Sequence, residues 1–154
     1  MVAGTSEEGR MVIANAELLV QRGNVNHAIE ILTKIQPNEN YYAMATKVLA
    51  NIYLVHKKDR ESFAECYKNL VQNCPNAETY LMLGDAYMSI QEAELAIDAY
   101  EQALKLNAKD VNLICKMGKA LVKTHHFTKA INYYKEAVSV YAKTIKHEQM
   151  KKLE

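Results

Sequence analysis

Proline, glycine and cysteine are scarce in this chain, and their scarcity excludes several classes of protein. Two prolines and five glycines among 154 residues leave no Pro- or Gly-rich linker, so the sequence marks no domain boundary. The cysteines Cys66, Cys74 and Cys115 are odd in number and show no C-x-x-C spacing, which argues against a disulfide framework or a zinc site. We therefore expect three small, buried, hydrophobic cysteine side chains.

A long apolar run is also missing. No tract approaches the roughly 18 apolar residues that a membrane span requires, so we expect no membrane insertion. The first ten residues, MVAGTSEEGR, include acids and lack a basic and apolar leader, so we expect no secretory signal. A hydrophobic content of 49% and a charged content of 24% are typical of a soluble globular chain. These features predict a cytoplasmic protein in a reducing compartment.

Residues arranged for catalysis are missing as well. The sequence has no Gly-rich phosphate loop, no nucleophile elbow and no Cys/His pairing at a recognised spacing. The only histidine pair, His125-His126, has no third ligand at a suitable spacing. Glu92 and Glu94 are turn and first-turn residues, where the helix dipole favours acids. We predict no catalytic residue, no metal and no cofactor, and hence no enzyme.

What the chain does contain is an internal repeat. The stretch 80–110, YLMLGDAYMSIQEAELAIDAYEQALKLNAKD, recurs 34 residues further on. Six small, apolar or aromatic positions coincide: Gly84/Gly118, Ala86/Ala120, Ala96/Ala130, Ile97/Ile131, Tyr100/Tyr134 and Ala103/Ala137. This period, with Ala, aromatic and Ala at fixed offsets after a Leu-Gly start, is the pattern of the tetratricopeptide repeat family, whose helix-turn-helix units stack on copies of themselves.

The family pattern predicts an all-α fold, a right-handed α-solenoid of about four helix-turn-helix repeats within a single domain, 1–154. The repeats are expected at about residues 9–42, 43–76, 77–110 and 111–144, with an end helix at 145–154. In the last two repeats the eighth position holds Gly84 or Gly118, and the twentieth holds Ala96 or Ala130. Small residues are expected there because the two helices of each repeat cross closely.

Local signals define some helix ends. Thr5 and Glu8 form a capping box that predicts a helix over Glu7 to Gln21, and Gly23 is placed to end it. In the second repeat, the turn HKKDRES at 56–62 has one extra residue, because the aromatic position that follows arrives one residue late. Insertions in turns are tolerated, so the repeat register continues beyond it.

Charge is distributed unevenly along the chain. Residues 1–110 contain 10 Lys or Arg and 15 Asp or Glu, a net charge of −5, whereas residues 111–154 contain 9 Lys and 3 Glu, a net charge of +6. A basic end of this kind suits an acidic partner or nucleic acid. However, no aromatic residues are interleaved with the lysines and no nucleic-acid-binding fold is recognised. The favoured interpretation is a solvated, lysine-rich face, with no nucleic-acid partner.

The predicted protein-binding groove lies along the first helix of each repeat. It comprises Ile13, Glu17, Val20, Lys47, Asn51, Leu54, Leu81, Asp85, Met88, Cys115, Lys119 and Val122. The twelfth position of the repeat is apolar in all four cases. A continuous apolar strip with flanking charges suits an extended peptide or an amphipathic helix. The same strip would also suit packing against neighbouring helices of the array, and both interpretations remain open.

Some tetratricopeptide domains hold the C-terminal carboxylate of chaperones with a clamp of Lys, Asn, Asn, Lys and Arg. Lys47 and Asn51 match the first two positions of this clamp. The next position, where the clamp has Asn, is Met82, and the last two are Asn112 and Lys116. A soluble co-chaperone-like adaptor that binds peptide tails is therefore the alternative function.

Beyond the generic repeat, three runs resemble one particular tetratricopeptide family. LMLGDAYMSIQEAELAIDAYEQAL, GKALVKTH and ANIYLVHKKDR are similar to the large tetratricopeptide subunit of intraflagellar transport complex A, with likeness from about residue 5 to 140. That family is far longer than this chain, which resembles a segment of it. The resemblance implies a non-enzymatic scaffold for retrograde transport in cilia. Its partners would be other subunits of the complex, in the cytoplasm at the cilium and the cilium base.

The two ends of such an array expose different surfaces. Ile145, Met150 and Leu153 are expected to lay an apolar edge on the fourth repeat and so to cover that end. The first helix has apolar side chains such as Met11 and Leu19 with no preceding repeat to shield them. We expect weak self-association through exposed array ends, mainly the first repeat.

Overall fold

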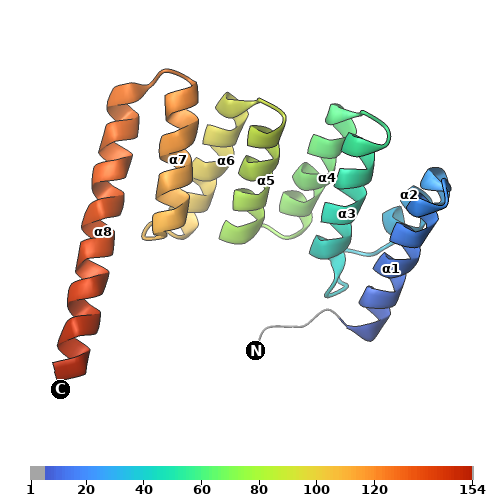
Figure 1. Cartoon of the computed structure of the whole chain (residues 1–154), viewed down its shortest axis with the longest axis horizontal. Helices are drawn as coiled ribbons and strands as arrows, with labels where there is room; N and C mark the ends of the chain where they lie inside the picture. Colours follow the sequence, from blue (N-terminus) through green and yellow to red (C-terminus); the bar gives the residue numbers. More distant parts are fainter. Residues whose placement is uncertain (1–5, 154) are drawn as a thin grey trace. The chain divides into compact units, whose positions relative to one another are not determined.

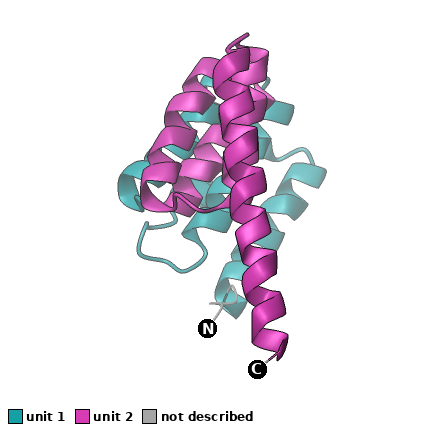
Figure 2. Cartoon of the chain, turned by 90° about the vertical axis from the view of Figure 1, so that its left-hand side faces the viewer, with its two compact units in different colours: residues 1–75 teal, residues 76–154 magenta. Residues whose placement is uncertain are grey.

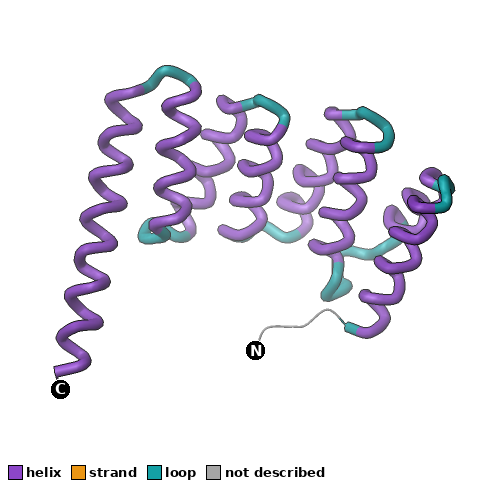
Figure 3. Tube along the Cα trace, in the orientation of Figure 1, coloured by secondary structure: helices purple, strands orange, loops and turns teal. Residues whose placement is uncertain are grey.

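A computed structural model describes residues 6–153, and its regular structure is entirely helical (Figures 1 and 3). In chain order the helices are α1 Glu7–Gln21, α2 Val25–Thr33, α3 Tyr42–Val55, α4 Arg60–Asn73, α5 Ala77–Ser89, α6 Ala93–Leu106, α7 Val111–Lys123 and α8 Phe127–Leu153. Short turns join them into four helix pairs, one for each predicted repeat. The predicted all-α repeat fold is confirmed.

The chain divides into two compact units, Met1–Pro75 and Asn76–Glu154, which Figure 2 distinguishes by colour. Each unit contains two helix pairs. Within the first unit α2 packs on α3, and within the second α6 packs on α7, so the second helix of one pair lies on the first helix of the next. The boundary between the units falls next to the boundary expected between the second and third repeats.

The start of α1 differs in one detail from the prediction. The helix spans Glu7–Gln21 as expected, but Ser6 is its N-cap, and the Ser6 Oγ accepts a 3.1 Å hydrogen bond from the backbone N–H of Gly9. The predicted cap, Thr5, lies outside the described residues. Serine caps a helix well because its hydroxyl satisfies one of the unpaired N–H groups of the first turn.

In three of the four helix pairs, the turn between the helices contains one residue in the left-handed conformation. Gly23, Gln91 and His125 have positive φ angles of 84°, 66° and 63°, and they occupy equivalent places in the first, third and fourth repeats. After α1, the N–H of Asn24 donates to the carbonyl of Leu19 at 2.8 Å, which is the bond of a Schellman motif. The repeat therefore imposes a left-handed residue at this place even where the sequence has no glycine.

The second repeat has the predicted insertion in its turn. Four residues separate α3 from α4, whereas three separate the helices of each other pair. Lys58 takes the positive φ, 54°, and the N–H of Asp59 reaches back to the carbonyl of Tyr53 at 2.9 Å. The carboxylate of Asp59 then caps α4 by accepting a 2.9 Å bond from the N–H of Ser62. The extra residue is absorbed before α4 begins.

The predicted helix crossings are confirmed in the second unit. A Cβ atom on Gly84 would overlap the ring of Tyr100, and one on Gly118 would lie 2.8 Å from the ring of Tyr134. The alanines predicted at the twentieth position of the same repeats are buried. Each glycine thus makes room for a tyrosine from the second helix of its own pair.

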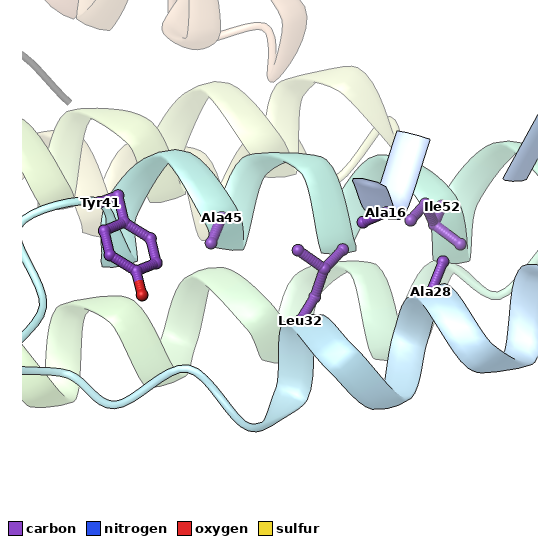
Figure 4. Close-up of a cluster of buried hydrophobic side chains, with 6 residues drawn as sticks. All are labelled: Ala16, Ala28, Leu32, Tyr41, Ala45 and Ile52. Carbon is purple, nitrogen blue, oxygen red and sulfur yellow. The ribbon is translucent and has the colours of Figure 1, made fainter. Parts of the chain in front are cut away.

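The core of the first unit combines small and large side chains. Figure 4 shows its buried cluster: Ala16, Ala28, Leu32, Tyr41, Ala45 and Ile52. Alanine at three of these positions allows helix axes to approach closely. Burial of a side chain the size of Leu32 contributes about 1.5–3 kcal/mol. Packing of this kind holds α1, α2 and α3 together.

The predicted end helix is wrong. Residues 145–153 continue α8, which is one helix of 27 residues, about twice as long as the 13-residue α7 (Figure 1). Ile145, Met150 and Leu153 are exposed, Leu153 by 88%, so they do not cover the fourth repeat. No glycine or proline interrupts the sequence of α8, and nothing in it ends the helix earlier.

Candidate protein-binding surfaces

All twelve residues predicted to line the groove lie on the first helices of the helix pairs. Six lie on α1 and α3 in the first unit, and six lie on α5 and α7 in the second. In the first unit, four of the six line one hollow. Two surfaces result, which we call the α1–α3 groove and the α5–α7 face.

The α1–α3 groove is a hollow of about 390 Å³. It is lined by Glu17, Val20, Gln21, Lys47, Val48, Asn51, Ile52 and His56. Four of these residues, Glu17, Val20, Lys47 and Asn51, were predicted from the repeat positions. Two predicted residues are not among the lining: Ile13, which is buried, and Leu54, which is half-buried.

The two walls of the α1–α3 groove differ in chemistry. Glu17 provides a carboxylate on the α1 side, whereas Lys47 and Asn51 provide an ammonium and an amide on α3. Val48 and Ile52 add an apolar strip beside them. The amide can pair with a peptide backbone, the opposite charges can orient a charged ligand, and the apolar strip can bury an aliphatic side chain.

Sequence reasoning missed half of this lining. Val48, Ile52 and His56 follow one another at i, i+4 and i+8, so they form the stripe next to Lys47 and Asn51 on the same helix. That spacing was the available signal. The expected groove positions came from the repeat pattern, which does not include this adjacent stripe.

On the α5–α7 face, Asp85 is already paired. Its Oδ1 accepts a 2.7 Å hydrogen bond from the hydroxyl of Tyr100, and its Oδ2 lies 2.6 Å from the Nζ of Lys116. Burial of Tyr100, together with its bond to the carboxylate, raises the pKa of the phenol. Asp85 therefore joins α5 to α6 and α7, and both oxygens of its carboxylate have partners within the protein.

The other predicted residues of the α5–α7 face differ in accessibility. Lys119 and Val122 are exposed, whereas Leu81, Met88 and Cys115 are half-buried. The exposed pair lies toward the C-terminal end of α7. This face therefore offers a ligand less free charge than the α1–α3 groove.

The positions of the chaperone clamp are only partly accessible. Lys47 and Asn51 line the α1–α3 groove, and Asn112 is exposed. Lys116 is held by Asp85, and Met82 is half-buried with a side chain that cannot replace an amide. Of the two lysines at clamp positions, Lys116 is thus engaged within the protein and Lys47 is accessible.

A second hollow, of about 410 Å³, lies within the second unit among α6, α7 and α8. It is lined by Glu94, Ile97, Asp98, Glu101, Met117, Leu121, His126, Lys129, Asn132 and Tyr133. The three acids lie on one face of α6 at i, i+4 and i+7, which is the sequence signal that was overlooked. Burial and the nearby Glu101 and Glu136 raise the pKa of Tyr133.

The cysteines agree in part with the prediction. Cys66 is buried, and burial raises the pKa of its thiol to about 11. Cys74 and Cys115 are half-buried rather than buried. A thiol with a raised pKa has little thiolate at neutral pH, so Cys66 is a packing residue.

The histidine pair has a structural role in the last turn. His125 takes the left-handed conformation after α7, and the N–H of His126 donates to the carbonyl of Leu121 at 2.8 Å. Within residues 6–153, no group of three His, Cys, Asp or Glu is arranged to hold a metal ion. None of the helices described is both long and apolar enough to cross a membrane.

Comparison with known families gives three matches along the chain. Residues 1–70 match the tetratricopeptide repeat protein 21 ARM repeat, and residues 113–153 match the fourth ARM domain of the same protein. Residues 84–124 match the TPR repeat. The matches include parts of both units.

The chain is similar to curated proteins that are much longer. It is 46% identical over 136 residues to tetratricopeptide repeat protein 21B of mouse and of human, which covers 88% of this chain and 10% of each relative. It is 43% identical over 139 residues to the tetratricopeptide repeat protein 21 homolog of Caenorhabditis elegans, covering 90% of this chain and 10% of that protein. The chain thus spans about a tenth of the length of these relatives.

Solved structures share the fold at low sequence identity. The crystal structure of MamA protein matches with a TM-score of 0.65 and 22% identity, covering 91% of this chain and 76% of that one. The second TPR of Spaghetti (RPAP3), bound to the HSP90 peptide SRMEEVD, matches with a TM-score of 0.52 and 21% identity, covering 64% and 91%. These likenesses concern the fold alone.

Proposed function

This chain belongs to the tetratricopeptide repeat family, and we propose that it is a non-catalytic protein-interaction scaffold corresponding to a segment of the large tetratricopeptide subunit of intraflagellar transport complex A. The observation that supports this proposal is the 46% identity to tetratricopeptide repeat protein 21B over 88% of the chain. In this proposal the partners are other subunits of that complex, and the process is retrograde transport in cilia.

The surface proposed for binding is the α1–α3 groove. Its Lys47 and Asn51 belong to α3, its Glu17 and Val20 to α1, and the hollow between them is open to solvent. Tetratricopeptide grooves suit an extended peptide or an amphipathic helix, which would place an apolar side chain on Val48. The partner segment is expected to carry an acid opposite Lys47, since Lys47 has no ion pair within the described residues.

The test is a pull-down from ciliated cells with the tagged chain, followed by quantification of the transport-complex subunits. Lys47→Glu reverses a charge in the groove and is expected to reduce their recovery at least severalfold. Lys109→Glu makes the same charge change at an exposed loop position and serves as the matched control. Equal recovery by both variants would mean that the α1–α3 groove is not the binding surface.

The same experiment addresses the alternative function, a soluble co-chaperone-like adaptor. Recovery of chaperones in place of transport-complex subunits would favour the adaptor. The ion pair of Lys116 with Asp85 argues against it, because a bound carboxylate would have to compete with an intramolecular partner at 2.6 Å. Both functions involve protein partners and no catalysis.

The proposal also predicts a location. A fluorescently tagged chain expressed in ciliated cells is expected to be in the cytoplasm and to concentrate at the cilium and the cilium base. Uniform cytoplasmic fluorescence, in cells where the full transport complex is present, would contradict the ciliary location. The scaffold function would then still be tested by the pull-down.

A further inference from the structure

One face of α8 has a regular stripe of apolar and aromatic side chains. The stripe comprises Phe127, Ile131, Tyr134, Val138, Tyr141 and Ile145. Their spacings alternate between four and three residues, which is the pattern of the seam through which one helix packs along another. Val138 is 69% exposed and Phe127 is 54% exposed. A hollow of about 350 Å³, lined by Ile131, Tyr134, Lys135 and Val138, lies on this stripe.

Two positions on α4 that correspond to this stripe are buried. Counted from the first residue of each helix, Ile131 and Val138 correspond to Ala64 and Val71 of α4. Ala64 is 7% exposed and Val71 is 9% exposed, whereas Ile131 and Val138 are exposed by more than half. Ile131 and Val138 therefore occupy packing positions of the repeat that no helix covers within the described residues.

Within residues 6–153, no helix covers the face of α1 that includes Met11. Met11 is 71% exposed, yet the residues 34, 68 and 102 positions later, Ala45, Thr79 and Leu113, are all buried. Leu18, which lies seven residues later on the same face of α1, is 43% exposed. In the other repeats this position of the first helix is enclosed, so α1 also presents an uncovered packing face.

The two helices that present the uncovered faces have opposite net charge. Between Phe127 and Leu153, α8 has six lysines and two glutamates, a net charge of +4. Between Glu7 and Gln21, α1 has three glutamates and one arginine, a net charge of −2. Two α8 helices would repel each other, whereas α8 and α1 attract.

We propose that α8 of one copy of this chain docks on α1 of a second copy, head to tail. The contact repeats one that the chain already makes twice within itself, since α2 packs on α3 and α6 packs on α7. It is separate from the α1–α3 groove. Because the contact joins different surfaces of the two copies, each dimer keeps one free face at either end and can add further copies.

Sedimentation equilibrium over a range of concentrations tests the contact. The parent chain is expected to gain average mass as concentration rises. Val138→Glu and Met11→Glu each place a carboxylate in one of the two faces, and each is expected to weaken association at least tenfold. Ser139→Glu makes a similar change at an exposed α8 position beside the stripe and should associate like the parent. Circular dichroism checks that every variant keeps the parent's helix content.

Mixing the two weakened variants distinguishes the arrangements. The Val138→Glu variant retains an intact α1, and the Met11→Glu variant retains an intact α8, so an equimolar mixture is expected to form a one-to-one dimer that neither forms alone. If only Val138→Glu weakens association and the mixture gives no dimer, α8 pairs with α8 and the proposal is overturned. A parent chain that stays monomeric up to its solubility limit overturns it as well.

Discussion

The hydroxyl of Tyr100 donates a 2.7 Å hydrogen bond to the carboxylate of Asp85, and the same tyrosine ring lies over Gly84. One side chain thus fills the space that a glycine leaves and satisfies the acid next to it. The other oxygen of Asp85 accepts from Lys116 on α7. The contacts of Asp85 with Tyr100 and Lys116 thus connect the crossing of α5 and α6 to α7, the first helix of the next repeat.

Replacing Asp85 by alanine is expected to destabilise the protein. The nearly buried Tyr100 hydroxyl would lose its acceptor and Lys116 would lose its partner, and an unsatisfied buried donor costs about 1–3 kcal/mol. Urea unfolding followed by circular dichroism measures the change. Asp98→Ala removes an exposed acid from α6 and is the control. Equal midpoints for the two variants would show that the Asp85 contacts add nothing to stability.

A leucine at Gly118 is expected to separate α7 from α8. Even a Cβ at this position would lie 2.8 Å from the Tyr134 ring, and overpacking of a close crossing costs roughly 1–3 kcal/mol. The melting temperature should fall by several degrees. Lys119→Glu changes the next, exposed residue and should leave it nearly unchanged. A Gly118→Leu protein that melts within a degree of the parent would contradict the crossing.

Asp59 is expected to make the stability of the second repeat depend on pH. Hydrogen bonds from the Ser62 hydroxyl and backbone N–H hold the pKa of its carboxyl below its ordinary value of 3.8. A lowered folded-state pKa means that the stabilisation is present above the unfolded-state pKa and is lost as pH falls through the folded-state value.

The measurement compares the unfolding free energy of the parent with that of Asp59→Ala as the pH is lowered from neutral. The parent's advantage should be largest above about pH 4 and should shrink below it, because the protonated acid is a weaker acceptor. An advantage that stays constant down to pH 2 would mean that the charge of Asp59 is not what caps α4.

Cys66 is expected to resist alkylation in the folded protein. Burial raises the pKa of its thiol to about 11, so very little thiolate is present at pH 8. The half-buried Cys74 and Cys115 should react with iodoacetamide first, and Cys66 only after unfolding in urea. Mass spectrometry of peptides from the labelled protein reports each site. Labelling of Cys66 as fast as Cys115 would contradict its placement in the core.

Much of the fold is predictable because its determinants are local. The coincidence of Gly84 with Gly118 at a period of 34 identifies close helix crossings, since only small residues permit them. Gly23 identifies the end of α1, because a left-handed residue commonly ends a helix. The extra residue before Asp59 is visible as a one-residue delay in the aromatic position that follows. Each of these signals depends on neighbours a few residues away or on the repeat itself.

The binding surface was less predictable, since it depends on side chains that meet across helices. Asp85 had the position of a groove residue, but Lys116, 31 residues later, reaches it and pairs with its carboxylate. Val48 and Ile52 belong to the stripe beside the expected one, and only the packing of α1 on α3 shows that they line the same hollow. A repeat pattern assigns a position to a helix face but does not show what fills the space opposite.

The sequence by itself determined the four helix pairs, their turns and their family, because helix periodicity, small residues at crossings and turn residues act over short distances. Only the tertiary structure decided that residues 145–153 extend α8, that Asp85 is paired and that Met11 and Val138 are left uncovered. Those features depend on whether an apolar or charged side chain finds a partner in three dimensions. The amino-acid pattern is the same whether or not that partner is present.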